Sequence, residues 1–366
     1  MWRYALKPLV VLAGAAATAA ACGPTAGLRP MVEPGAVVAS GWPQEIHLIN
    51  AAHGTVHRRV AVGVDIERPL VVGETLLGID GDEIVGFRLD DGTETFRFES
   101  GGGAFLSPVL AQGTRVMGLS LAGGGQDFDR VVAFDTRTGK RAWSRPLKAN
   151  GASSDAGRQL QLGAGLLVAA TTHTVAGIDP YGGNLRWSRA FAAEVISVAV
   201  VANGVAVLTD DGRVVHLHAV DNRVQWSVAL ADVEADNGWD APALAAAGER
   251  LLFRQNGRLV ALDGQTGQVA WRGPGPVTAF TVGVDVALVR FGDDALGTVD
   301  VASGGLRWRR DDLDVDASEP IVSEPAGVVV FQESSSTLYA VELSDGRLRF
   351  EVDLSEGEAV LDLASR

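Results

Sequence analysis

A segment that recurs along the chain is the feature that most restricts its fold. Ala133-Phe-Asp135-Thr-Arg-Thr138-Gly139-Lys-Arg-Ala-Trp143 returns as Ala261-Leu-Asp263-Gly-Gln-Thr266-Gly267-Gln-Val-Ala-Trp271. In both copies a glycine follows the carboxylate by four residues and a tryptophan follows the glycine by four. A repeat of this kind predicts an array of similar supersecondary units rather than one irregular domain.

Looser copies of the same spacing extend over the rest of the chain. They are Asp179…Gly183…Trp187, Asp300…Gly304…Trp308, His218…Asn222…Trp226, Glu342…Gly346…Phe350, Arg88…Gly92…Phe96 and Asn50…Gly54…Arg58. The middle positions of the eight copies are 37 to 47 residues apart. A period close to 40–45 residues with short strands is typical of a β-propeller, in which each repeat forms one four-stranded blade.

Each position of the repeat has a physical reason. A short carboxylate can accept backbone N–H groups two residues further on and close a turn. The glycine suits the left-handed conformation of a bulged hairpin, and the aromatic ring on the returning strand can fill the gap between blades. We therefore assign a structural docking role to thirteen residues: Asp135, Gly139, Trp143, Asp179, Gly183, Trp187, Trp226, Asp263, Gly267, Trp271, Asp300, Gly304 and Trp308.

The segments between these copies read as antiparallel hairpins. In the fifth repeat, Asn203-Gly204 and Asp211-Gly212 separate β-rich runs, and such pairs are strong hairpin signals. The first repeat lacks an inner strand, and Ala359–Ala364 has no blade of its own. We therefore predict an all-β domain over residues 35–366: an eight-bladed β-propeller of four-stranded antiparallel blades, closed by the C-terminal strand completing the first blade.

The N-terminus is predicted to be an export signal. Arg3 and Lys7 precede the uncharged run Leu9–Ala21, which is too short to span a bilayer comfortably. Residues 1–21 are therefore interpreted as a signal peptide. The chain's single cysteine, Cys22, follows three alanines, so residues 22–34 are interpreted as a lipidated cysteine and a flexible tether. Cleavage by ordinary signal peptidase, leaving Cys22 unlipidated, stays open.

Two of these features carry a family resemblance. The segment before Cys22 resembles a bacterial lipobox, with Ala19 at a position that is usually leucine. The repeat resembles the tryptophan-docking motif of pyrroloquinoline-quinone-type (PQQ-like) propellers, with two full copies and about three partial ones. A lipobox followed by one propeller is similar to the BamB family, accessory lipoproteins of the outer-membrane β-barrel assembly machinery.

The resemblance implies a non-catalytic, lipid-anchored scaffold outside the cytoplasmic membrane, on the periplasmic side of the outer membrane in a Gram-negative cell. Its partner would be a protein of the cell envelope, in that family the repeat domains of the barrel-inserting protein. The alternatives are a propeller that binds or senses a small ligand and, behind it, a PQQ-dependent dehydrogenase. Such dehydrogenases resemble one another in having adjacent cysteines, which a chain whose single cysteine is Cys22 lacks. We expect no cofactor and no enzyme activity.

Charge and histidine spacing narrow the function classes further. A formal net charge of −14 argues against nucleic-acid binding, which needs a basic surface. His216 and His218 share a face of an expected strand and could bind a metal, but no third ligand is adjacent, so no metal site is assigned.

Three long loops are the expected contact surfaces, because they exceed what a hairpin needs: Gly123–Asp129, Ala149–Arg158 and Asp232–Asp240. In the last of them carboxylates surround a tryptophan, an arrangement that can steer a basic partner and then bury the ring. The candidate partner-binding residues are Asp232, Glu234, Asp236, Trp239 and Asp240.

Overall fold

The computed structural model of the chain is built of strands. It describes residues 10–11, 36–41, 45–50, 53–63, 67–80, 82–99, 105–120, 128–148, 158–201, 203–234, 243–292, 295–313, 320–323, 326–332, 337–353 and 358–360. Within these ranges there is no helix, and hence no helical segment that could cross a membrane.

The strands of the first four sheets are β1 (Val10–Val11), β2 (Ala36–Gly41), β3 (Glu45–Asn50), β4 (Val56–Ala61), β5 (Glu67–Val72), β6 (Thr75–Asp80), β7 (Glu83–Arg88), β8 (Glu94–Glu99), β9 (Phe105–Gln112), β10 (Arg115–Ser120), β11 (Phe128–Asp135), β12 (Lys140–Lys148), β13 (Gln159–Gly163), β14 (Leu166–Thr171), β15 (Thr174–Ile178) and β16 (Leu185–Ala190).

Those of the remaining sheets are β17 (Val195–Val201), β18 (Gly204–Thr209), β19 (Arg213–His218), β20 (Val224–Ala229), β21 (Leu244–Ala247), β22 (Arg250–Gln255), β23 (Arg258–Asp263), β24 (Val269–Arg272), β25 (Val277–Val282), β26 (Val286–Phe291), β27 (Ala295–Asp300), β28 (Leu306–Arg310), β29 (Ile321–Ser323), β30 (Val328–Gln332), β31 (Thr337–Glu342), β32 (Leu348–Asp353) and β33 (Glu358–Val360).

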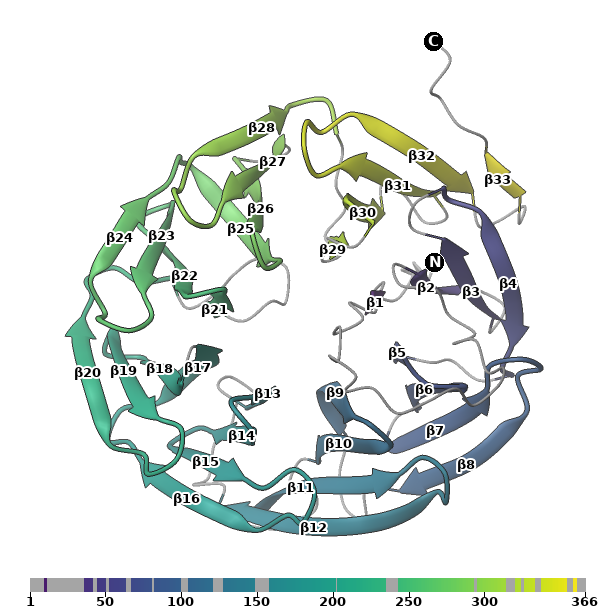
Figure 1. Ribbon diagram of the computed structural model, residues 1–366, viewed down its shortest axis with the longest axis horizontal. Coiled ribbons are helices and arrows are strands. Elements are labelled where there is room, and N and C mark those ends of the chain that lie inside the picture. The colour runs from purple at the N-terminus through teal and green to yellow at the C-terminus, as the bar shows by residue number, and fades with distance from the viewer. Residues whose placement is uncertain are drawn as a thin grey trace, which may run out of the picture.

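Consecutive strands pair antiparallel into sheets that stand around a central axis (Figure 1). In each sheet the first strand lies nearest the axis and the fourth lies on the rim, as with β17 and β20. The hairpins fall where the turn signals predicted them: Asn203 directly precedes β18, and Asp211-Gly212 joins β18 to β19. The all-β propeller of four-stranded antiparallel blades is confirmed.

The core lies between neighbouring blades. Leu208 and Val214 of one sheet pack in a single cluster with Leu251 and Phe253 of the next. The second strand of a blade is buried on both faces, as in β18, where all six residues are buried. The outer strand alternates instead, because one of its faces meets solvent. Blade-to-blade burial of aliphatic side chains is therefore the main force that holds the ring together.

The finer prediction, an eight-bladed ring whose first blade is completed by the C-terminal strand, is wrong. Strands β5 to β32 form seven complete four-stranded blades, and β33 adds to the last of them as a fifth, outermost strand beside β32. The sheet at the N-terminus has three strands, β2–β4, plus the two-residue strand β1, which pairs with Val37 and Val38. The C-terminal strand pairs with the outer edge of its own blade because that edge directly precedes it.

The antiparallel order gives the ring two distinct faces. The first-to-second and third-to-fourth hairpins of each blade, including all docking turns, lie at one face, which we call the docking face. The second-to-third hairpins and the connections to the next blade lie at the other, the loop face. All three long loops predicted from sequence join strands at the loop face, since they follow β10, β12 and β20.

Candidate functional site

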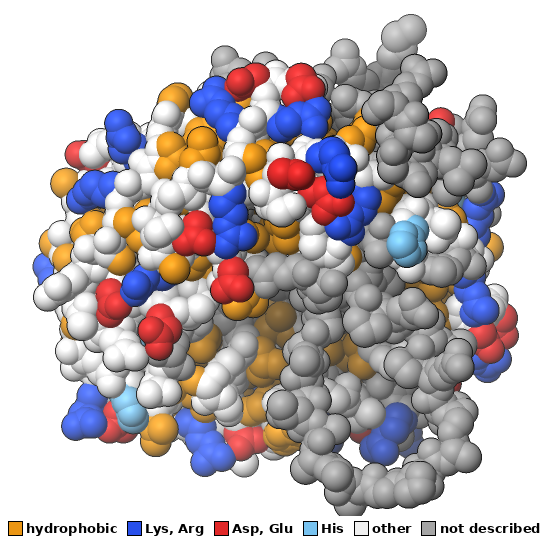
Figure 2. Space-filling view, turned by 45° about the horizontal axis from the view of Figure 1, so that its top comes forward, with side chains coloured by type: hydrophobic (Ala, Val, Ile, Leu, Met, Phe, Trp, Pro, Cys, Tyr) orange, Lys and Arg blue, Asp and Glu red, His pale blue; other side chains and the backbone are white. Residues whose placement is uncertain are grey.

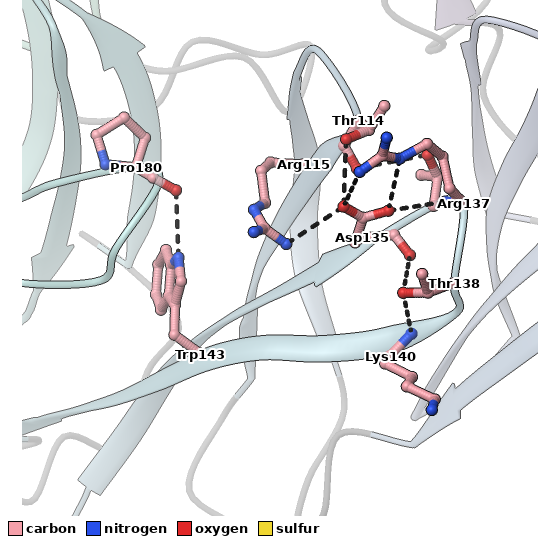
Figure 3. A network of polar contacts seen from close by, with 9 residues as sticks. Thr114, Arg115, Asp135, Arg137, Thr138, Lys140, Trp143 and Pro180 are labelled. Atoms are coloured by element: carbon pink, nitrogen blue, oxygen red, sulfur yellow. Dashed lines mark hydrogen bonds and ion pairs between the residues drawn. The ribbon is translucent and has the colours of Figure 1, made fainter.

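The docking turns show how the sequence repeat works locally. In the blade formed by β9–β12, the backbone N–H of Arg137 donates to the Asp135 carboxylate at 3.0 Å, and the Thr114 hydroxyl donates to it at 3.3 Å (Figure 3). The side chain of Arg137 also pairs with Asp135. The hydrogen bonds from the side chain and the backbone of Arg137 lower the pKa of Asp135, with the side chain as the main cause. The Asp135 carboxylate thus accepts hydrogen bonds within its own turn.

The same turn recurs with variations. Asp300 accepts from Ser303 and pairs with Arg307 at 2.7 Å, and these contacts lower its pKa to about 2, chiefly through Arg307. In the blade formed by β17–β20, His218 replaces the carboxylate, and its ring Nδ1 lies 2.9 Å from the Asp221 carboxylate. Asn222 takes the glycine position of that turn with φ of 52°, a left-handed conformation that asparagine tolerates better than most residues.

Each docking tryptophan reaches across to the next blade. The indole N–H of Trp143 donates to the Pro180 carbonyl at 3.2 Å (Figure 3). The indole ring lies against Gly183. Gly183 has φ of 67°, and a Cβ there would lie 2.5 Å from the indole. Other indoles make the same bond: Trp187 to Ala219 at 2.6 Å, Trp226 to Gly264 at 3.1 Å, Trp271 to Val301 at 2.8 Å and Trp308 to Leu343 at 2.9 Å.

Phenylalanines hold the equivalent position in two other blades. Phe96 lies against Gly139, where a Cβ would be 2.6 Å away, and Phe350 lies against Gly54, where it would be 2.5 Å away. Phe350 and Ile49 also share one buried cluster. The last blade therefore docks on the N-terminal sheet by the same contact that joins the other blades.

An arginine two residues after the docking aromatic was missed by the sequence reasoning. Arg145 donates to the Gly183 carbonyl through Nε at 2.9 Å and through a terminal nitrogen at 2.7 Å. Arg189 donates likewise to Asn222, and Arg310 to Gly346. The signal was present, because Trp143-Ser-Arg145 and Trp187-Ser-Arg189 repeat the same tripeptide. Each such arginine satisfies a turn carbonyl at the blade boundary.

The candidate partner loop begins beside β20. Asp232 is exposed and has φ of 55°, whereas Glu234 is half-buried and pairs with Arg254. Glu234 also accepts the Gly257 backbone N–H at 2.7 Å. Its carboxylate thus fixes the loop to the hairpin between β22 and β23. The other three candidates, Asp236, Trp239 and Asp240, lie outside the described residues.

The other two long loops end at a common anchor. Asp129 at the end of one and Arg158 at the end of the other form an ion pair at 3.0 Å. The Asp129 side chain is fully buried and that of Arg158 is 9% exposed. Because Asp129 belongs to β11 and Arg158 directly precedes β13 of the next blade, the pair joins both loop ends at the loop face. Removing one partner of such a buried pair is strongly destabilising.

The two histidines considered as metal ligands differ in environment. His216 is 1% exposed and stacks on Trp226 with ring centroids 5.1 Å apart, and burial lowers its pKa. His218 is partly exposed in its turn. Within the described ranges no group of three or more histidine, cysteine, aspartate or glutamate residues is placed to hold a metal ion. Cys22 lies outside these ranges.

A comparison with family models gives the relationship directly. The model described as outer membrane protein assembly factor BamB matches residues 1–161, 127–279 and 245–364. The chain belongs to the BamB family. The resemblance inferred from the lipobox and the repeat is thereby confirmed.

Two curated BamB proteins are similar in sequence. Outer membrane protein assembly factor BamB of Yersinia pestis is 30% identical over 207 residues, which cover 50% of this chain and 52% of that protein. BamB of Moranella endobia (strain PCIT) is 26% identical over 274 residues, 68% of this chain and 67% of that protein. The match to the Yersinia pestis relative thus spans about half of its length.

Solved structures share the fold. BamB from Moraxella catarrhalis superposes with a TM-score of 0.59 at 12% identity, covering 85% of this chain and 92% of that one. A quinohemoprotein alcohol dehydrogenase from Pseudomonas putida HK5 superposes with a TM-score of 0.58 at 9% identity, covering 86% and 69%. At these identities the likeness shows the propeller fold alone.

Proposed function

We propose that this chain is a non-catalytic, lipid-anchored scaffold of the cell envelope that assists the assembly of outer-membrane β-barrel proteins. The observation that carries the proposal is the BamB family match, which extends from the first residue to residue 364. The two relatives are assembly factors by name. The partner would be a protein of the assembly machinery, and the site of action the periplasmic face of the outer membrane.

The geometry supports a scaffold rather than a reaction centre. The most regular polar and aromatic contacts hold the ring together: Asp135 accepts hydrogen bonds within its own turn, and Trp143 docks on the next blade. Connections longer than a hairpin needs follow β10, β12 and β20 at the loop face, and loops on a rigid ring are natural contact surfaces. We assign partner contact to this face, with Asp232 and Trp239 as its proposed steering and anchoring residues.

The central hollow is the place where the small-ligand alternative would apply. On the face that Figure 2 shows, hydrophobic side chains of the described residues lie inside it, and acidic, basic and apolar side chains are mixed around it. Nothing in this arrangement favours a particular ligand. The dehydrogenase likeness lies at the level of fold, so neither alternative gains an observation of its own.

The N-terminus completes the proposal. We propose that residues 1–21 are removed and that Cys22 is lipidated. The sheet β2–β4, which follows this segment, is joined to the last blade by Phe350 on Gly54. Replacing Cys22→Ser should release the protein from membranes into the soluble envelope fraction. Mass spectrometry of the wild-type mature protein should find acyl chains on Cys22; an unmodified N-terminus would contradict the anchor.

The function is tested by affinity capture from envelope extracts of the source bacterium. Tagged wild-type protein should retain the barrel-assembly machinery, and Trp239→Ala should retain less of it; capture by both proteins should weaken as salt rises. The docking variant Trp143→Ala serves to separate folding from contact. Failure of the wild-type protein to retain any component of that machinery would contradict the proposal.

A further inference from the structure

The outer strand of each blade has one hydrogen-bonding edge directed away from the ring. In the last blade this edge is covered, because β33 pairs antiparallel with β32, with Glu351 opposite Val360 and Asp353 opposite Glu358. In the other blades no strand of the described chain pairs with the outer edge. The exposure of the side chains differs accordingly: β32 has no exposed residue, whereas the residues of β20 are exposed or half-buried.

Bare edge strands invite pairing with other chains, and proteins guard them with charges, prolines or short length. Charged residues occur on the outer strands β4, β8, β12, β16, β24 and β28, and β12 also contains Pro146. Strand β20, with the sequence Val-Gln-Trp-Ser-Val-Ala, is the one outer strand of the described chain with no charge and no proline. Its edge lacks the protection that its neighbours have.

The pairing of β20 shows which of its backbone groups face outward. The Leu230 N–H donates to the Gly212 carbonyl at 2.8 Å, and Val228 lies opposite Val214 in the same ladder. Hydrogen-bonded and non-hydrogen-bonded pairs alternate along an antiparallel ladder. The N–H and C=O groups of Ser227 and Ala229 therefore point away from β19, and both residues are exposed.

Acidic side chains gather at the end of this edge. The hairpin that contains Asp210 and Asp211 lies beside the end of β20, and Asp232 follows two residues after Leu230. All three aspartates are exposed, and the neighbouring basic residue, Arg213, lies 3.9 Å from Asp211. At the opposite end Val224 is 45% exposed and Val220 is 76% exposed. The edge thus runs from an apolar start to an acidic end.

We propose that the outer edge of β20 binds an extended segment of a protein partner as an antiparallel fifth strand, in the way that β33 covers β32. An antiparallel strand would place its N-terminal end beside Asp211 and Asp232, so the segment should carry basic residues there, followed by alternating apolar residues that meet Val224. A second copy of this chain is a poorer fit, because two chains of net charge −14 repel each other. The inference rests on the proposed scaffold function and names the partner's chemistry.

A proline at residue 229 tests the edge. Ala229 lies three residues after Trp226, and Pro146 lies three residues after Trp143 in β12, so Ala229→Pro copies a residue that the ring already accommodates. Proline would remove an outward N–H donor and leave the β19 ladder intact. The probe is a fluorescein-labelled peptide in which two lysines precede alternating valine and threonine residues. Its binding is measured by fluorescence anisotropy.

The matched control is Ala190→Pro, at the same position of the charged outer strand β16. Wild type and Ala190→Pro should bind the lysine peptide equally, and Ala229→Pro should bind it about tenfold more weakly. A peptide with two glutamates in place of the lysines should bind more weakly to all three proteins. No binding by wild type, equal binding by Ala229→Pro, or equal loss in Ala190→Pro would each overturn the proposal.

Two further readouts separate this inference from the function on which it rests. If wild type and Ala229→Pro capture the barrel-assembly machinery equally, the edge is not the contact although the scaffold function stands; if wild type captures none, the function itself fails. Sedimentation velocity should show a monomer. A dimer that Ala229→Pro dissociates would assign the edge to a second copy and overturn the partner proposal.

Discussion

Trp143 and Gly183 belong to different blades, and the indole ring of the first occupies the space that a side chain on the second would need. A Cβ on Gly183 would lie 2.5 Å from the ring, and the indole N–H is held by the Pro180 carbonyl at 3.2 Å (Figure 3). The contact therefore requires both residues: a large ring on one strand and no side chain on the facing turn.

Truncating this ring should destabilise the protein without affecting a partner site. We expect Trp143→Ala, which removes a half-buried ring and its hydrogen bond, to lower the free energy of unfolding by about 3 kcal/mol, the lower end of the range for truncating a core aromatic. Trp143→Phe keeps most of the packing and should lose only about 1 kcal/mol for the hydrogen bond. Denaturant unfolding measures both; an unchanged midpoint for Trp143→Ala would show that the ring does not hold the blades together.

The arginine beside the docking ring should also contribute to stability. Arg145→Met keeps much of the aliphatic stem but removes two hydrogen bonds to the Gly183 carbonyl. The expected cost is about 1–3 kcal/mol, the range for a hydrogen bond to a charged group. Arg141, an exposed arginine on the same strand, offers the control, and Arg141→Met should leave the unfolding midpoint nearly unchanged. Equal effects of the two variants would argue against the role of Arg145.

His216 should make the fold sensitive to mild acid. Its pKa is lowered from 6.5, chiefly by burial, so the folded state favours the neutral ring and the unfolded state binds the proton more readily. Stability is therefore complete above pH 6.5 and decreases as the pH falls below that value. His216→Phe should remove this part of the pH dependence. Unfolding curves at pH 7.5 and pH 5.5 compare the two proteins; identical slopes with pH would contradict the assignment.

Asp300 should act in a more acidic range. Its pKa in the folded state is about 2 against an ordinary 3.8, chiefly because of Arg307. The stability that the ionised carboxylate contributes is present above pH 3.8 and is lost as the pH falls through 2. The difference in unfolding free energy between wild type and Asp300→Asn should therefore shrink from pH 5 to pH 2. A difference that stays constant over this range would mean that the carboxylate's charge is not involved.

The fold was predictable where the repeat dictated it. The regular spacing of Asp135, Gly139 and Trp143 in the repeat is enough to predict the length of a four-stranded blade. Closure was not predictable, because a short β-rich segment such as Ala359–Val360 can pair with any bare edge. In the structure it pairs with the nearest one, β32, while Phe350 on Gly54 joins the last blade to the first sheet.

The candidate partner site was predictable only in part. The position of Asp232 at the loop face follows from strand order, which the sequence supplies. The engagement of Glu234 by Arg254 does not, because it depends on a hairpin twenty residues further along the chain. The exposed edge of β20 also escaped notice, since a charge-free strand matters only once it is known to lie on the rim.

The central claim, that this propeller assists the assembly of outer-membrane β-barrels, is tested most directly in a strain of the source bacterium from which the chain has been deleted. The measurement is the amount of folded β-barrel protein in the outer membrane, determined by quantitative mass spectrometry of heat-modifiable species. The account predicts a lower amount in the deletion strain, restored by the wild-type chain and restored less fully by Cys22→Ser. Equal amounts with and without the chain would contradict it.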